Sequence, residues 1–271
     1  MKRVLTILIA LLLYAGIQGQ TIVHLSSTTA TLECYDAEHP VAAVVVCPGG
    51  SYSWLDYKVE GVEVAQWLQT HGISAYVLRY RVQGWWAWAT HYRLIFRGNR
   101  YPDPLRDAEA ALDWLTANAD SLGINPSRIG IMGFSAGGHL AMLSTYTRQP
   151  AFVAPIYPVV TMRQECCHTR SRRALLGEYD RCSQVMRDSL SLEEHVRPNC
   201  PPVFLVNCID DPIVDYRNSV ILDSALTANN IPHQYIQYRT GGHGFGMSDT
   251  RGSAECRPWK EEFLKWLKTV L

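Results

Sequence analysis

The sequence predicts an α/β fold, with a mostly parallel central sheet and helices on both of its faces. Two observations predict it. Short apolar runs of strand length alternate along the chain with stretches of helical periodicity. Glycine-rich or acidic segments directly follow several of these runs, at what would be the carboxyl edge of a parallel sheet. The chain has 271 residues, of which 47% are hydrophobic, and this suits one domain with one large core.

The predicted elements follow one another in a regular order. Residues 41–47 form a continuous apolar run, which is typical of a strand buried on both faces. Residues 58–71 predict a helix that ends at Gly72. Residues 105–122 predict a longer helix with Asp107 in its first turn, where a carboxylate interacts favourably with the helix dipole or caps the helix. The other predicted strands cover residues 21–35, 73–79, 128–132, 151–158, 202–208 and 234–238, and the other predicted helices cover residues 139–144, 219–229 and 258–271.

Two segments interrupt this alternation. Residues 82–100 are rich in aromatic side chains, and Trp85, Trp86 and Trp88 either anchor the loop to the core or form a flap that binds substrate. Residues 161–199 carry several arginines and acids, and we expect a small cap segment there, either as a solvated helical surface or as a site for acidic sugars.

The N-terminus has the pattern of a signal peptide. Lys2 and Arg3 precede a short apolar stretch, and a small residue, Gly19, ends the segment. The apolar stretch is shorter than the roughly 20 residues that a spanning helix needs. We therefore expect a signal peptide over residues 1–19, an exported protein, periplasmic or secreted, and one folded domain over residues 20–271.

The most informative motif is Gly133-Phe134-Ser135-Ala136-Gly137, which lies between a predicted strand and a predicted helix. In this context the G-x-S-x-G pattern predicts a nucleophile elbow, a sharp turn that leaves the serine hydroxyl exposed. The small glycines let the backbone turn tightly, and the N-terminus of the following helix faces developing negative charge.

An acid and a histidine follow the serine in chain order. Asp210 and Asp211 come directly after the strand predicted at 202–208, and one of them is expected to serve only as a turn or capping residue. His243 lies in a glycine-rich loop after the last predicted strand. The order serine, aspartate, histidine is that of the α/β-type hydrolases and differs from the orders of chymotrypsin-like and subtilisin-like enzymes.

A glycine turn after the strand at 41–47 can supply backbone donors. Pro48-Gly49-Gly50-Ser51 directly follows this strand, and N–H groups in such a turn can stabilise the oxyanion of an acyl-transfer intermediate.

Composition excludes several other classes of function. Lys and Arg number 25 and Asp and Glu also number 25, so the net charge is zero, which argues against a nucleic-acid partner. Neither a zinc-protease motif nor paired Cys-x-x-Cys motifs occur, and Cys166, Cys167 and His168 lack a second ligand pair at a suitable spacing. We therefore expect no metal and no cofactor.

The sequence has eight cysteines, which permit disulfides in an exported chain without fixing their pairing. Cys47 and Cys208 lie in predicted central strands and are expected to be buried thiols. A disulfide within the segment that holds Cys166, Cys167, Cys182 and Cys200 is a further hypothesis.

Taken together, these motifs resemble a known family. The chain looks like a secreted serine esterase of the α/β-hydrolase fold, similar to acetyl xylan esterases and to the hormone-sensitive-lipase branch. The resemblance covers nearly the whole chain beyond residue 19 and rests on residues 47–52, 78–81, 101–108, 133–139, 201–214 and 241–246.

The resemblance implies a role for each residue of the site. It implies Ser135 as nucleophile, Asp211 as the acid and His243 as the base, with the oxyanion hole formed by the backbone N–H groups of Gly50, Ser51 and Ala136. Lipase relatives carry His-Gly-Gly-Gly where this chain has Pro48-Gly49-Gly50-Ser51, so Ser51 is the donor that this departure affects most.

The resemblance also implies a substrate class. It points to short acyl groups, especially acetyl, on a polysaccharide such as xylan, with Tyr52, Trp85, Trp86 and Trp88 as substrate-binding side chains. A serine exopeptidase or a lipase on the same scaffold is the alternative enzyme, and a non-catalytic glycan-binding relative is the alternative outside enzymes. The sequence does not determine the oligomeric state.

Overall fold

The computed structural model describes residues 21–89, 98–177 and 182–271. Within them one sheet of eight strands has the order β1-β2-β4-β3-β5-β6-β7-β8. The first two strands pair antiparallel, and β2 pairs antiparallel with β4, whereas all pairs from β4 to β8 are parallel. The strands are β1 Thr21–His24, β2 Thr31–Tyr35, β3 Ala42–Cys47, β4 Ile73–Arg79, β5 Ile129–Phe134, β6 Val153–Ile156, β7 Val203–Cys208 and β8 His233–Tyr238.

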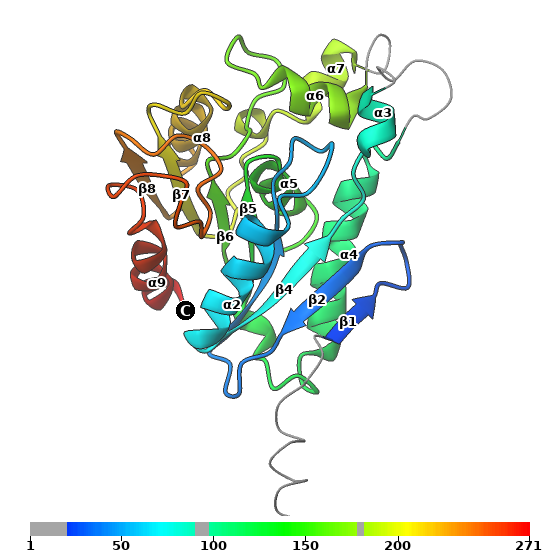
Figure 1. Ribbon diagram of the computed structural model, residues 1–271, viewed down its shortest axis with the longest axis vertical. Helices are drawn as coiled ribbons and strands as arrows, with labels where there is room; N and C mark the ends of the chain where they lie inside the picture. The colour runs from blue at the N-terminus through cyan, green and yellow to red at the C-terminus, as the bar shows by residue number, and fades with distance from the viewer. Residues whose placement is uncertain (1–20, 90–97, 178–181) are drawn as a thin grey trace, which may run out of the picture.

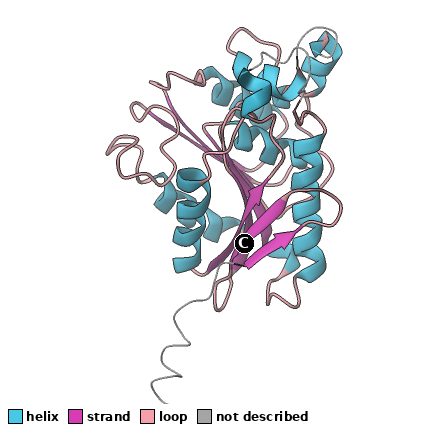
Figure 2. Ribbon diagram, turned by 45° about the vertical axis from the view of Figure 1, so that its right-hand side comes forward, coloured by secondary structure: helices cyan, strands magenta, loops and turns pink. Residues whose placement is uncertain are grey.

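Helices cover both faces of this sheet, as the alternating pattern predicts (Figure 1, Figure 2). One core joins the sheet to α4 (Asp103–Asn118), α5 (Ala136–Ser144) and α8 (Arg217–Ala228). The other joins it to α2 (Glu63–Thr70) and α9 (Trp259–Val270). The central strands β3, β5 and β7 are buried along their whole length, which explains their unbroken apolar sequence.

Two predicted helices differ in detail from the structure. The helix predicted at 58–71 begins with a five-residue π-helix, η1 (Lys58–Val62), before it becomes α2. The helix predicted at 105–122 begins two residues earlier, with Pro104 in its first turn, and ends at Asn118. Asp107 does not cap it, because its carboxylate is fully buried and binds the Arg81 guanidinium at 2.8 Å. This ion pair instead joins α4 to the chain that follows β4.

The two irregular segments lie at the end of the molecule towards which the parallel strands point (Figure 1). Helix α3 (Trp85–Ala89) lies in the aromatic segment, of which residues 90–97 are outside the described residues. Helices α6 (Thr169–Leu176) and α7 (Gln184–Ser189) and the 3₁₀ turn η4 (Leu192–Glu194) lie in the predicted cap segment. A further 3₁₀ turn, η2 (Pro126–Arg128), leads into β5.

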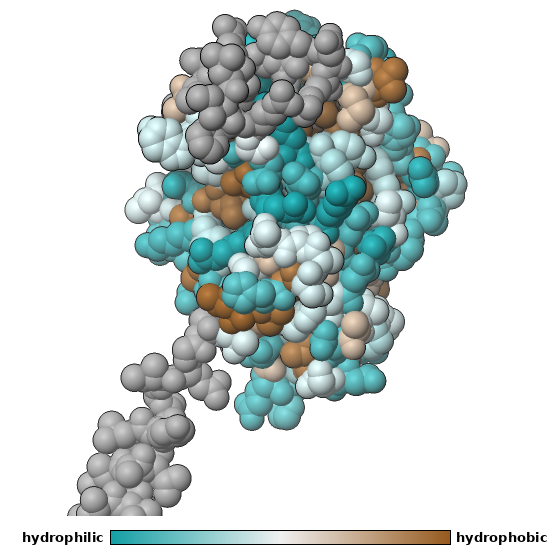
Figure 3. Space-filling model, turned by 90° about the vertical axis from the view of Figure 1, so that its right-hand side faces the viewer, coloured by the Kyte–Doolittle hydropathy of each residue, from teal (hydrophilic) through white to brown (hydrophobic). Residues whose placement is uncertain are grey.

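The surface around β1, β2 and α4 is mostly hydrophilic with small hydrophobic patches (Figure 3). Among the described residues, no helix is both long enough and apolar enough to cross a membrane. The predicted signal peptide at residues 1–19 lies outside the described residues.

Candidate active site

Ser135 lies at the turn between β5 and α5, and its backbone is strained. Its φ is 54° and its ψ is −117°, a region that residues with a side chain rarely adopt. The glycines beside it permit the close packing of this turn. A Cβ on Gly133 would stand 2.0 Å from the Gly137 carbonyl oxygen, and one on Gly137 would stand 2.1 Å from the Cys47 carbonyl oxygen. The sequence pattern therefore produces the sharp elbow for a steric reason.

The structure brings Ser135, His243 and Asp211 together from three strand ends. His243 Nε2 lies 2.8 Å from Ser135 Oγ, and His243 Nδ1 lies 2.6 Å from Asp211 Oδ2. Asp211 is nearly fully buried on its side chain, and its Oδ1 accepts the N–H groups of Ile213 and Val214 at 2.8 and 2.9 Å. These bonds fix the carboxylate, and the carboxylate in turn fixes the imidazole.

The neighbouring Asp210 has a different function. Its carboxylate accepts the N–H of Gly241 at 3.2 Å and the N–H of Gly242 at 2.8 Å. Both glycines have positive φ, as do Gly244 and Gly246 beyond the histidine. Asp210 therefore holds the loop that carries His243, while Asp211 contacts the histidine itself. The sequence left the choice between these two acids to the family resemblance.

The turn after β3 presents backbone donors beside the serine. A Cβ on Gly49 would stand 3.0 Å from the Ser135 Cβ, so this turn packs directly against the elbow. Gly50 and Ser51 have φ of 130° and 57°, and the described residues include no acceptor for the N–H of either. Ala136 is the first residue of α5, where N–H groups lack partners within the helix.

The Tyr52 side chain is placed differently from its prediction as a substrate contact. Its side chain is 1% exposed, and its hydroxyl binds His139 Nδ1 at 2.8 Å. His139 Nε2 binds the Leu190 carbonyl oxygen at 2.8 Å, so Nε2 carries the proton and Nδ1 accepts the tyrosine hydroxyl. Burial lowers the pKa of His139 to about 4, which keeps it neutral. The Tyr52 side chain thus supports the turn from within the core, and its ring is not accessible to a substrate.

Two tryptophans of the aromatic segment, Trp85 and Trp86, lie on the surface. Trp85 and Trp86 are 61% and 67% exposed, and their rings lie 5.1 Å apart in an edge-to-face arrangement. The Trp88 side chain lies outside the described residues. A binding function for these side chains stays a prediction.

The predicted cap segment contributes a histidine near the site. Burial and the charges of His243 and Arg170 together lower the pKa of His168 to about 4. His168 Nδ1 binds the Ser171 hydroxyl at 2.8 Å. Cys166, Cys167, Cys182 and Cys200 form no disulfide, contrary to the hypothesis of a bridge among them. Among the described residues, no three His, Cys, Asp or Glu side chains are grouped so that they could bind a metal ion.

Sequence reasoning missed a buried acid that interacts with His243. Glu60 is 2% exposed in η1, and burial raises its pKa to about 7. It was missed because helical periodicity assigns charged positions to the solvent face, and η1 departs from this periodicity. The sequence feature that could have indicated its burial is the glycine that follows it. Gly61 packs against β4, and a Cβ on it would stand 2.9 Å from Val77.

Two protein-family models and several known proteins are similar to this chain. The model of the dienelactone hydrolase family matches residues 98–271, and the BD-FAE family model matches residues 36–156. A crystal structure of an acetyl ester-xyloside bifunctional hydrolase from Caldicellulosiruptor lactoaceticus superposes with a TM-score of 0.81 at 29% identity, covering 94% of this chain and 98% of that one.

Two curated relatives are similar over most of this chain. An acetylxylan esterase of Xylanibacter ruminicola is 32% identical over 80% of this chain and 44% of its own length. An endo-1,4-beta-xylanase B of Butyrivibrio fibrisolvens is 27% identical over 76% of this chain and 33% of its own length. The chain thus spans less than half the length of these two relatives.

Proposed function

Because the chain belongs to the dienelactone hydrolase family and has the α/β-hydrolase fold, we propose that it is a serine ester hydrolase. The observation that carries the proposal is the pair of short contacts that His243 makes, one to Ser135 Oγ at 2.8 Å and one to Asp211 at 2.6 Å. A hydroxyl beside an oriented imidazole is the arrangement of an activated nucleophile.

The proposed reaction follows from this geometry. His243 Nε2 takes the Ser135 proton while Oγ attacks the ester carbonyl, and Asp211 stabilises the imidazolium that forms. The N–H groups of Gly50, Ser51 and Ala136 bind the oxyanion. His243 then protonates the leaving alcohol, and water hydrolyses the acyl-enzyme by the same route. These steps need no cofactor.

We propose acetyl groups on a xylan-type carbohydrate as the substrate. The similarity to an acetylxylan esterase and to an acetyl ester-xyloside hydrolase supports this choice. A polysaccharide of this kind lies outside the cell, so the N-terminal signal pattern supports the same proposal, with export as a part of it.

The direct test is hydrolysis of p-nitrophenyl acetate, butyrate and octanoate by the wild-type protein and by Ser135→Ala. We expect acetate to be hydrolysed fastest and the variant to lose about 10⁶-fold in kcat. Ser224→Ala, on the exposed face of α8, is the matched control and should retain full activity. Equal rates for wild type and Ser135→Ala would refute the proposed nucleophile, and a preference for octanoate would favour the lipase alternative.

The exposed tryptophans offer a test of the carbohydrate substrate. We expect Trp85→Ala combined with Trp86→Ala to raise KM for acetylated xylan several-fold, because aromatic faces stack on sugar rings, and to leave KM for p-nitrophenyl acetate unchanged. The same increase for both substrates would argue against a carbohydrate contact at α3.

A further inference from the structure

Glu60 connects two loops of the proposed site through hydrogen bonds. Its Oε2 accepts the N–H of Gly49 at 2.7 Å, and its Oε1 accepts the hydroxyl of Tyr157 at 2.8 Å. The Tyr157 hydroxyl in turn accepts the N–H of Gly246 at 3.0 Å. Gly49 directly precedes the proposed oxyanion donors, and Gly246 lies in the loop of His243. One buried carboxyl group therefore joins the two loops.

The same group lies close to the histidine. A Cβ on Gly244, the residue after His243, would stand 3.9 Å from Glu60 Oε1. The Tyr157 ring packs against the His243 ring with centroids 4.8 Å apart. Tyr157 has a φ of 38°, a strained value for a residue with a side chain, and η1 is a π-helix. Both irregularities are of the kind that proteins retain at functional sites.

The direction of these hydrogen bonds favours the ionised form of Glu60. The Gly49 N–H can only donate, so it occupies one carboxyl oxygen as an acceptor. The Tyr157 hydroxyl already accepts from Gly246, so its own proton points to the other oxygen. A proton on Oε1 would have to be donated to Tyr157, whose own hydroxyl proton would then lose its acceptor, and a proton on Oε2 would weaken that oxygen as the acceptor of the Gly49 N–H. Either change would weaken the connection between the loops.

Several charged and titratable groups interact with Glu60. Burial raises its pKa, the charge of His243 lowers it, and Asp56 raises it. Arg251 lies beyond Asp56 and forms an ion pair with it. Tyr80 and Tyr157 have pKa values raised by their own burial and by the Glu60 charge, so both are neutral at working pH.

We propose that Glu60 is a positioning residue, which in its ionised form holds the loop of Gly49 and the loop of His243 together and stabilises the protonated histidine. The inference rests on the proposed ester hydrolysis and adds a second ionisation that this activity requires. Because the pKa of Glu60 is about 7, this ionisation falls in the range where histidine also titrates.

The test is the pH dependence of kcat/KM for p-nitrophenyl acetate in wild type and in Glu60→Gln. If both His243 and Glu60 must lose a proton, log kcat/KM of the wild type rises with a limiting slope of 2 at low pH. The glutamine variant should show a slope of 1, because only the histidine titrates. We also expect its kcat to fall about 10- to 100-fold with little change in KM, since the proposed oxyanion donors lose their support.

Glu63→Gln is the matched control, because Glu63 lies one turn away and its side chain is partly exposed, where it forms an ion pair with Lys58 at 3.8 Å. Its slope and kcat should equal those of the wild type. Tyr157→Phe keeps the Glu60 charge and removes one donor to it, which should shift the acidic limb to higher pH. This variant carries the test if Glu60→Gln does not fold.

Two outcomes would overturn the inference, and they are distinguishable. A slope of 2 in Glu60→Gln, with activity lowered equally at every pH, would show that Glu60 is merely structural. Equal rates for the wild type and Ser135→Ala would instead refute the proposed ester hydrolysis, and the function of Glu60 with it.

Discussion

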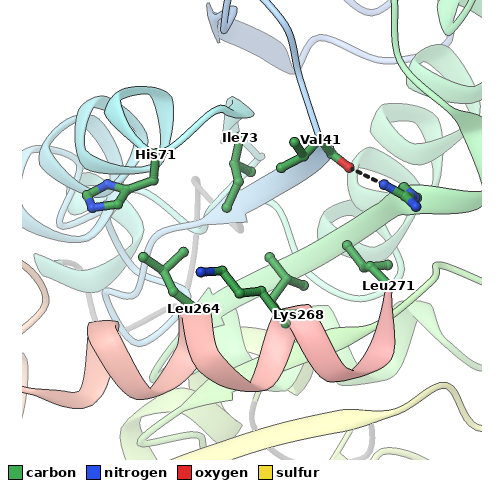
Figure 4. A pocket seen from close by; sticks show the side chains of 8 residues that line it. Val41, His71, Ile73, Leu264, Lys268 and Leu271 are labelled. Atoms are coloured by element: carbon green, nitrogen blue, oxygen red, sulfur yellow. Dashed lines mark hydrogen bonds between the residues drawn. The ribbon is translucent and has the colours of Figure 1, made fainter.

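The two ends of the parallel sheet differ in what lies beyond the strands. At the carboxyl end, Ser135, Asp211 and His243 contact one another, and buried Glu60 joins two of the loops. At the amino end lies a groove of about 290 Å³ between α9 and the start of β3 and β4 (Figure 4). The groove is lined by Val41, His71, Ile73, Arg128, Leu264, Leu267, Lys268 and Leu271.

The two ends differ in the hydrogen-bond partners of their polar side chains. In the groove Arg128 donates to the Val41 carbonyl oxygen at 3.4 Å, and His71 Nδ1 binds the Trp67 carbonyl oxygen at 2.8 Å. Each of these groups satisfies the backbone close to it. At the carboxyl end the side chains bind one another across three strand ends. In this protein, polar side chains that converge indicate a reactive site better than the presence of a groove does.

Of the substitutions that test this comparison, one at Asp211 should have the largest effect on activity. Asp211→Asn should lower kcat for p-nitrophenyl acetate about 10⁴-fold, because the amide favours the wrong histidine tautomer. Asp210→Asn is the matched control and should lower kcat far less, since Asp210 binds only the N–H groups of Gly241 and Gly242. A greater loss at Asp210 would show that the acid has been assigned to the wrong residue.

An intermediate effect is expected for His139, whose side chain supports the carboxyl end by binding the Tyr52 hydroxyl and the Leu190 carbonyl oxygen. Its pKa is about 4 in the folded protein and 6.5 in the unfolded chain. As pH falls from 7 to 5, the unfolded chain binds a proton that the folded protein does not, so His139 lowers the stability. The free energy of unfolding should fall by roughly 2 kcal/mol, because each pH unit between 6.5 and 5 contributes about 1.36 kcal/mol.

Urea unfolding at pH 7 and at pH 5 measures this effect. His139→Gln removes the ionisation, so the stability difference between wild type and variant should change by about 2 kcal/mol between the two pH values, in favour of the variant at pH 5. Comparing the two proteins at each pH cancels the contribution of Glu60. A difference independent of pH would mean that folding does not lower the pKa of His139.

The smallest effect is expected in the groove at the amino end. Leu264→Ala removes part of an apolar wall and should lower the free energy of unfolding by about 1 kcal/mol. It should change kcat/KM for p-nitrophenyl acetate less than twofold, because the groove contributes no group to the proposed chemistry. A larger change in kcat/KM would break the contrast between the two ends.

Much of the carboxyl end could be predicted from the sequence, because its signals are local. The strand, the glycines and the helix around Ser135 define a sharp turn wherever they occur together. Asp211 and His243 each follow a strand, and parallel strands deliver their carboxyl ends to one edge of the sheet. The predicted fold and the meeting of these three side chains follow from such short segments.

Glu60, Tyr157 and the contact between Tyr52 and His139 could not be predicted in this way. Each pairs residues far apart in the chain, and none has a motif. Tyr52 resembled a substrate contact because it follows the glycine turn, yet its ring turns into the core. Asp107 resembled a helix cap because it lies in the first turn of α4, yet it binds Arg81.

The sequence by itself determined the order of strands and helices, the elbow at Ser135 and the strand ends that carry the acid and the histidine, since backbone sterics and apolar periodicity act within a few residues. Only the tertiary structure decided which acid contacts His243 and which buried polar groups support the two loops. The reason is that burial and hydrogen-bond partners depend on contacts between distant segments, and these contacts set the charge of Glu60 and of His139.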